Sequence, residues 1–178
     1  MVVPLFAACG SGEKTAQAPG VLAEKMPVAQ ILTNFRTDSR FRYEWAPLLS
    51  GGQMYTDRGY FYIGVPPDLS GFPALKPAND DKYSSAEQVD FITFTLTRKA
   101  RVYIIYTNLN TRLEARWLTG VNGWQREKLL IETTLTENKS TRLVRSREFP
   151  AGAKVALGGN GCEIYDCDMF TVVIEPVP

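Results

Sequence analysis

The 178-residue sequence contains no histidine. This absence excludes serine–histidine and cysteine–histidine nucleophile pairs, imidazole general bases, and zinc or copper sites built on imidazole. The sequence also lacks an excess of charge of one sign, since 20 basic residues stand against 19 acidic ones. Proteins that bind phosphate backbones need a basic surface, so we expect no nucleic-acid partner. Carboxylates, Lys, Tyr and Arg could still act as catalysts, but the composition favours a protein that is not an enzyme.

Cysteine is also scarce, and its three copies fall into two groups. Residues 1–8, MVVPLFAA, form an apolar run that ends in two small residues directly before Cys9, and a polar stretch continues to residue 27. This pattern resembles the lipobox of bacterial lipoproteins; the alternative is a chance apolar start with a free thiol. The resemblance implies a signal-peptide remnant over residues 1–8 and acylation of Cys9. Residues 9–27 would then be a flexible tether to a membrane of the cell envelope, and Gly10 favours the outer membrane.

The other two cysteines, Cys162 and Cys167, are five positions apart near the end of the chain. Export would place them in an oxidising compartment, where neighbouring thiols tend to pair. The four residues between them are enough to return the chain to the roughly 4.4–6.8 Å Cα separation of a disulfide. We therefore predict a Cys162–Cys167 disulfide. A soft metal site on both thiolates would need two further ligands, which this sequence supplies poorly.

Residues 28–178 have the pattern of many short strands. Residues 28–35 could form one or two helical turns, and strand-like runs follow that are rich in aromatic and β-branched residues: 40–46, 60–65, 89–97, 100–107, 114–118, 127–134, 142–148, 155–157 and 169–175. Glycine, proline and asparagine separate these runs at short intervals. The pattern predicts one all-β domain, an antiparallel, jelly-roll-like β-sandwich of eight to ten strands.

Two details of this fold can also be predicted. Runs 89–97 and 100–107 are separated by Arg98 and Lys99, a link short enough for a hairpin. We expect the core to contain one residue of each of three neighbouring pairs, because successive strand residues point to opposite faces. These pairs are Phe91 or Phe94, Tyr103 or Ile104, and Val172 or Val173.

Several separated motifs between residues 54 and 175 share an order and spacing. They are YTDRGYFYIGVP at 55–66, PANDDK at 77–82, VDFITFTL at 89–96, ARVYIIYT at 100–107, FPAGAKVALGGN at 149–160 and MFTVVI at 169–174. Together they resemble the β-sandwich module that accompanies secreted polysaccharide lyases of the pectate-lyase type and other exported carbohydrate-active proteins. The resemblance implies an accessory module that binds carbohydrate or attaches to a surface, with no established catalytic residues.

Two acidic segments are candidate sites. Asn79, Asp80 and Asp81 lie in a loop, and we favour a structural turn there because Asn and Asp form local backbone hydrogen bonds. The alternatives are a calcium site, since these side chains offer the hard oxygen ligands that Ca²⁺ prefers, and contact with a substrate. We therefore expect no cofactor other than a possible calcium ion. Asp57 and Arg58 would tie a loop to a strand, or Arg58 would bind the carboxylate of a sugar acid through two hydrogen bonds.

Aromatic residues supply the third candidate site. Trp117 and Trp124 flank the turn at residues 119–123 and could form a platform on which a sugar ring stacks, or they could belong to the core. We expect Trp124, next to Asn122 and Gly123, to be the more exposed of the two.

The sequence thus predicts a non-catalytic lipoprotein of the cell envelope that binds carbohydrate or attaches to a surface. Its partner would be a polysaccharide or another envelope or extracellular protein. The alternatives are a structural or protein-interaction subunit of an extracellular assembly and, less favoured, a polysaccharide lyase. The sequence leaves the oligomeric state open.

Overall fold

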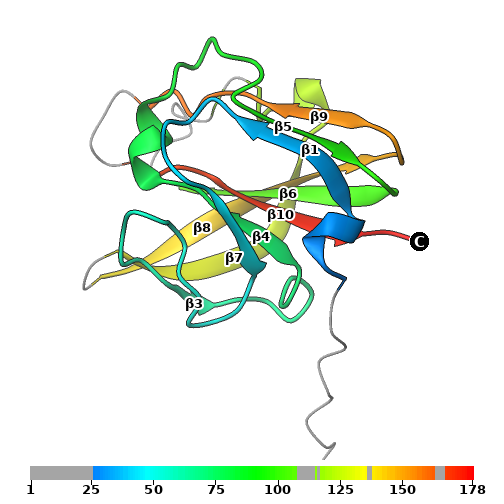
Figure 1. Ribbon diagram of the computed structural model, residues 1–178. Coiled ribbons are helices and arrows are strands. Elements are labelled where there is room, and N and C mark those ends of the chain that lie inside the picture. Colours follow the sequence, from blue (N-terminus) through cyan, green and yellow to red (C-terminus); the bar gives the residue numbers. More distant parts are fainter. Residues whose placement is uncertain (1–25, 108–114, 116, 136–137, 163–166) are drawn as a thin grey trace, which may run out of the picture.

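The computed structural model describes residues 26–107, 115, 117–135, 138–162 and 167–178, and in these residues the chain forms a sandwich of two antiparallel sheets (Figure 1). The smaller sheet has three strands, ordered β1 (Leu32–Thr37), β5 (Ile92–Leu96) and β9 (Lys154–Leu157). The predicted all-β, antiparallel fold class is confirmed.

The larger sheet has seven strands and curls into a half-barrel. Its order is β2 (Glu44–Pro47), β4 (Pro73–Lys76), β10 (Thr171–Pro176), β6 (Ala100–Thr107), β8 (Asn138–Phe149), β7 (Gln125–Leu135) and β3 (Tyr62–Gly64). The last strand, β10, therefore lies between β4 and β6 in the interior of the sheet.

The predicted hairpin between residues 89–97 and 100–107 is wrong. Strand β5 pairs with β1 and β9, whereas β6 pairs with β10 and β8 in the other sheet. The link at Arg98 and Lys99 lacks the Asn-Gly chemistry of a two-residue hairpin turn, and here it carries the chain from one sheet to the other. The crossing lets Phe94 and Leu96 of β5 join the same core as Val102 and Ile104 of β6.

Residues outside the sheets differ from the prediction in smaller ways. Only residues 28–30 of the segment 28–35 are helical, as the 3₁₀ turn η1 (Val28–Gln30), and β1 follows. Residues 115, 117 and 118 lie outside any strand. The other two turns are η2 (Asn79–Tyr83) and η3 (Gly120–Asn122).

Among the described residues, none of the helices has the length and hydropathy to cross a membrane. Cys9 and the proposed tether up to residue 25 lie outside the described residues.

The core occupies both faces of the middle of the larger sheet. All six residues proposed as alternatives are buried, including both members of the pairs Tyr103/Ile104 and Val172/Val173. One face packs against the three-stranded sheet. On the other face, Tyr55 of the loop before β3 donates a hydrogen bond to the Met169 carbonyl, and Tyr62 of β3 itself donates one to Thr171 Oγ1. The prediction that each pair contributes to the core is confirmed, and the curled sheet buries its second face as well.

Candidate functional site

Trp117 and Trp124 lie against each other at one edge of the sandwich. Their ring centroids are 5.8 Å apart at an interplanar angle of 72°. Trp117 also meets Phe170 edge to face at 5.1 Å, and Trp124 meets Phe149 at 6.1 Å. The two tryptophans that the sequence singled out therefore form one aromatic cluster.

The relative exposure of the two tryptophans is opposite to the prediction. Trp124 is only 3% exposed, whereas Trp117 is half-buried. The turn η3 ends at Gly123 in the left-handed region, with φ of 80°, and the backbone N–H of Trp124 returns to the carbonyl of Thr119. This reversal directs the Trp124 ring inward onto Phe149, so the expectation that Trp124 is the more exposed residue is wrong.

A pocket of about 410 Å³ opens beside the cluster. Its wall combines both tryptophans with apolar, amide and charged side chains. These side chains belong to residues 86–89, Asn122, Arg147 and Ala156. The Trp117 Nε1–H donates to the Gly159 carbonyl at 3.0 Å, which fixes the ring. An aromatic ring held in place next to hydrogen-bonding groups is the combination that binds small polar ligands.

Arg147, which the sequence analysis did not single out, supplies the positive charge of this pocket. Its Nη1 donates to the Asn122 carbonyl at 2.8 Å, and its guanidinium carbon lies 4.7 Å from the centre of the Phe149 ring. The side chain passes close to Gly123, where a Cβ would come within 3.4 Å of Nε. Within the described part of the chain, no carboxylate is paired with this exposed guanidinium. Arg147 was missed because its approach to the tryptophan turn depends on the pairing of β8.

The contacts of Asp57 and Arg58 favour the structural alternative, although they join the loop to the turn η2 and not to a strand. The Asp57 carboxylate accepts hydrogen bonds from the backbone N–H groups of Asn79 and Asp80, at 2.7 and 3.1 Å. It thereby satisfies donors at the start of η2, as a capping side chain does. Arg58 forms an ion pair with Asp80 and lies 3.6 Å from Asp57. The pair ties the loop at residue 57 to η2.

The three residues considered for calcium point toward three different partners. Asn79 Oδ1 accepts from the Met169 N–H at 3.0 Å, and Asp80 pairs with Arg58. Asp81 accepts from the hydroxyls of Ser39 and Tyr43. Burial, and then the hydrogen bond to Asp81, raises the pKa of Tyr43. In the described ranges, no cluster of three acidic, Cys or His side chains could hold a metal ion. This geometry favours the turn interpretation of Asn79, Asp80 and Asp81.

Cys162 and Cys167 form the predicted disulfide, with their Cα atoms 6.3 Å apart. The N–H of Cys162 donates to the Lys82 carbonyl at 3.0 Å, and the Asn160 side-chain amide donates to the carbonyls of Lys82 and Asp168. The disulfide therefore joins two points of a loop that is fastened to η2 on one side and to the start of β10 on the other.

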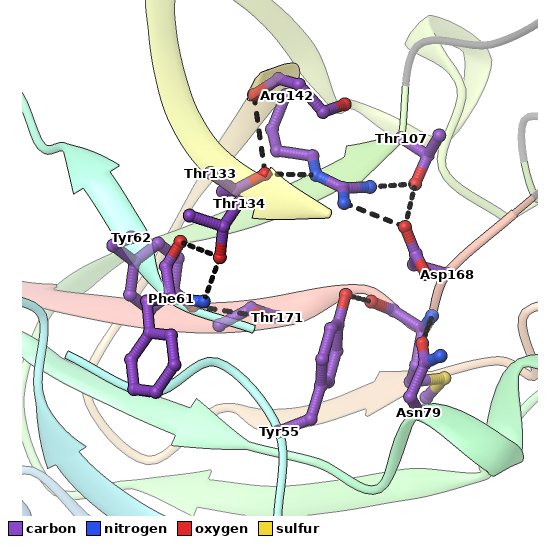
Figure 2. A network of polar contacts seen from close by, with 12 residues as sticks. Tyr55, Phe61, Tyr62, Asn79, Thr107, Thr133, Thr134, Arg142, Asp168 and Thr171 are labelled. Carbon is purple, nitrogen blue, oxygen red and sulfur yellow. Dashed lines mark hydrogen bonds and ion pairs between the residues drawn. The ribbon is translucent and has the colours of Figure 1, made fainter. Parts of the chain in front are cut away.

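A buried polar network escaped the sequence analysis entirely (Figure 2). Arg142 of β8 is 1% exposed, and its Nη2 lies 2.7 Å from Oδ2 of the buried Asp168. Its Nε donates to Thr133 Oγ1 at 3.1 Å, and its Nη1 donates to the Thr107 hydroxyl. The network joins three parts of the chain, because Thr107 lies on β6, Thr133 on β7 and Asp168 just before β10. The only signal in the sequence is an arginine inside a strand-like run.

Comparisons with known proteins give the fold but no family. No known family matches the sequence, and neither does any curated protein. Among solved structures, the chain is similar to a β-glucuronidase of glycoside hydrolase family 2, with a TM-score of 0.72 and 18% identity over 86% of this chain. It is also similar to a glycoside hydrolase of family 138 that targets the pectin rhamnogalacturonan II, with a TM-score of 0.55 and 9% identity over 80% of this chain.

The match spans 15% of the length of each of these two structures. At such identities the likeness shows a shared fold, so the chain is a β-sandwich module of a kind that also occurs within large carbohydrate-active enzymes. The resemblance to the module of pectate-lyase-type enzymes agrees with this only at the level of a carbohydrate-related β-sandwich.

Proposed function

We propose that this protein binds an acidic polysaccharide, without cleaving it, in the pocket beside Trp117. The observation that carries the proposal is the position of Arg147 in the wall of that pocket. This exposed guanidinium, which forms an ion pair with none of the described carboxylates, lines the same pocket as the half-buried Trp117 ring; the Glu87 carboxylate also lines that pocket.

The chemistry of the two side chains is complementary to a sugar acid. The C–H face of a pyranose ring packs on an aromatic plane, and Trp117 is the ring of the cluster that is partly accessible. A guanidinium binds a carboxylate through two parallel hydrogen bonds, which gives both affinity and orientation. Asn122 and Gln88 line the same wall. The Asn122 amide donates to the Trp117 carbonyl and to Thr119 Oγ1, and the Gln88 amide donates to Asp38, so both side chains are held in place.

The names of the structural neighbours support a carbohydrate ligand. One is a β-glucuronidase and the other targets a pectin. We transfer from them the class of ligand and not the activity, because this chain spans only a small part of each. The side chains around the pocket are of the kinds that hold a sugar. Because the sequence also contains no histidine that could act as a general base, we propose binding rather than catalysis.

The test is a titration of the protein with polygalacturonate and with glucuronoxylan, each compared with its carboxyl-reduced form. We expect binding to an acidic polymer and at least fivefold weaker binding to its reduced form, because the reduced form lacks the carboxylates that Arg147 would bind. Equal binding to both forms, or to neither, would contradict the proposal.

Val89 offers a sharp variant for the same experiment. It lines the pocket and is 72% exposed, so the fold should tolerate a polar replacement. Val89→Glu places a carboxylate where the acidic ligand binds, and Val89→Gln has nearly the same shape without the charge. We expect Val89→Glu to weaken binding about fivefold relative to Val89→Gln, the effect of roughly 1 kcal/mol of repulsion at about 4 Å in water.

A control variant separates local from overall charge. Gln30→Glu adds the same charge at an exposed position in η1 that does not line the pocket, and it should bind like the unmodified protein. If Gln30→Glu and Val89→Glu weaken binding equally, the effect is one of net charge and the site lies elsewhere.

We further propose that the domain is held at the cell envelope by acyl chains on Cys9. The support is the lipobox-like start of the sequence, and two or more acyl chains suffice for stable anchoring. Intact mass of the protein extracted from membranes tests this, because an unmodified chain that starts at Met1 would refute it.

A further inference from the structure

A second pocket, of about 450 Å³, lies on the other side of the η3 turn. Strands β6, β7 and β8 supply its side chains: Arg101, Gln125, Glu127, Ser146, Arg147 and Glu148, with Gly123 at its edge. Its wall is mostly polar, in contrast to the aromatic wall beside Trp117. Both volumes fall in the range of small-molecule sites.

The charged groups of this second pocket are held in place by one another. Arg101 donates to Glu148, and Lys99 lies 3.5 Å from the same carboxylate. The hydrogen bond from Arg101, and then the charge of Lys99, lowers the pKa of Glu148. The hydroxyl of Ser146 donates to Glu127. A set of fixed acceptors and donors such as this suits the hydroxyl groups of a sugar, which both donate and accept.

The two pockets meet at Arg147, which lines both of them. Three consecutive residues at the end of the η3 turn also lie along this boundary. Asn122 and Trp124 line the first pocket, and Gly123 lines the second. The guanidinium, held by the Asn122 carbonyl and by the Phe149 ring, therefore stands at the boundary. A ligand that is bound by Arg147 in one pocket has the other pocket directly beside it.

We propose that the Arg101–Glu127–Glu148 pocket is a second subsite for the same glycan, so that the protein binds several consecutive sugar units of a chain. This inference rests on the proposed function, since it assigns a neighbouring unit of the polymer to the second pocket. The aromatic pocket holds one unit through Trp117 and Arg147, and the polar pocket holds the hydroxyls of the next units.

The test is calorimetric titration of the full protein with galacturonate and its oligomers, from the monosaccharide to the hexamer. Affinity should rise with length beyond the monosaccharide, and one oligomer should bind per protein. The variant is Gln125→Glu, because it is nearly isosteric, lies at an exposed position and lines only the second pocket. We expect it to weaken hexamer binding about fivefold and to leave monosaccharide binding unchanged. The difference should shrink at high salt.

The matched control is Gln30→Glu, which makes the same change at an exposed position in η1. It should leave the binding of every oligomer unchanged.

If Gln125→Glu has no effect on the hexamer while Val89→Glu still weakens binding, the second subsite is refuted and the proposed function stands. The subsite is also refuted if Gln125→Glu weakens binding of the monosaccharide as much as that of the hexamer, or if two hexamers bind per protein. If the unmodified protein binds no oligomer and no acidic polymer, the proposed function and the subsite both fall.

Discussion

At the scale of single residues, the Arg142–Asp168 pair is the feature with the largest expected effect on stability. Both side chains are buried, and Arg142 is fastened to three strands or loops through Asp168, Thr107 and Thr133. Removing one member of a buried ion pair leaves the other charge without compensation.

We therefore expect Arg142→Met to lower the free energy of unfolding by about 3–5 kcal/mol, measured by urea denaturation. The double variant Arg142→Met/Asp168→Leu should recover part of this loss, because it removes both charges. Arg126→Met, at an exposed position of β7, is the control and should change stability by less than about 0.5 kcal/mol. A loss below about 1 kcal/mol for Arg142→Met would contradict the assignment of the pair as a structural network.

At the scale of elements, Asp57 decides how η2 is attached to the rest of the fold. Its carboxylate accepts two backbone hydrogen bonds from the start of that turn. We expect Asp57→Ala to cost about 2 kcal/mol in thermal or urea unfolding, since hydrogen bonds to a charged group are the stronger ones. Asp68→Ala, which removes a carboxylate at an exposed position, should have little effect.

The same element permits a check of the calcium alternative. The oxygens of Asn79, Asp80 and Asp81 already accept hydrogen bonds or ion pairs within the protein. We therefore expect EDTA to leave the melting temperature unchanged. A fall in melting temperature on adding EDTA, reversed by excess Ca²⁺, would restore the metal interpretation.

The order of strands in the two sheets is also an element-scale property, and the sequence could not supply it. Alternating apolar and polar residues predicted strands at 89–97 and 100–107, and the structure has β5 and β6 there. Their pattern says which residues are buried but does not say which sheet each strand enters. A short link suits a hairpin as well as a crossing, and only the assembly of Phe94 and Ile104 into one core from two different sheets decides between them.

At the scale of the whole molecule, stability should fall in alkaline solution. Burial raises the pKa of Tyr62 to about 12 and raises that of Tyr55 as well. In the unfolded chain these phenols ionise near their ordinary value of about 10. Between about pH 10 and pH 12 the unfolded state therefore binds fewer protons than the folded state. The stability is fully present below about pH 10 and is lost as the pH rises toward 12.

For each such tyrosine the loss is about 1.4 kcal/mol per pH unit in that interval, measured by urea unfolding at several pH values. Tyr62→Phe should make the slope shallower by about one proton, although it also removes the hydrogen bond to Thr171. Tyr83→Phe, at a position that is 53% exposed, is the control for the exchange of tyrosine for phenylalanine itself. Equal slopes for Tyr62→Phe and the unmodified protein would contradict the prediction.

The sequence by itself determined the fold class, the disulfide and the aromatic cluster. Each of these depends on local pattern: alternation along strands, two cysteines five residues apart, and two tryptophans on either side of a short turn. Tertiary structure alone decided which tryptophan is accessible, which partners Asp57 and Arg58 find, and that Arg147 reaches the pocket. These depend on contacts between β8, η2 and η3, which are far apart in the chain. Side-chain direction is a local property, whereas burial and charge pairing depend on what the rest of the chain places opposite.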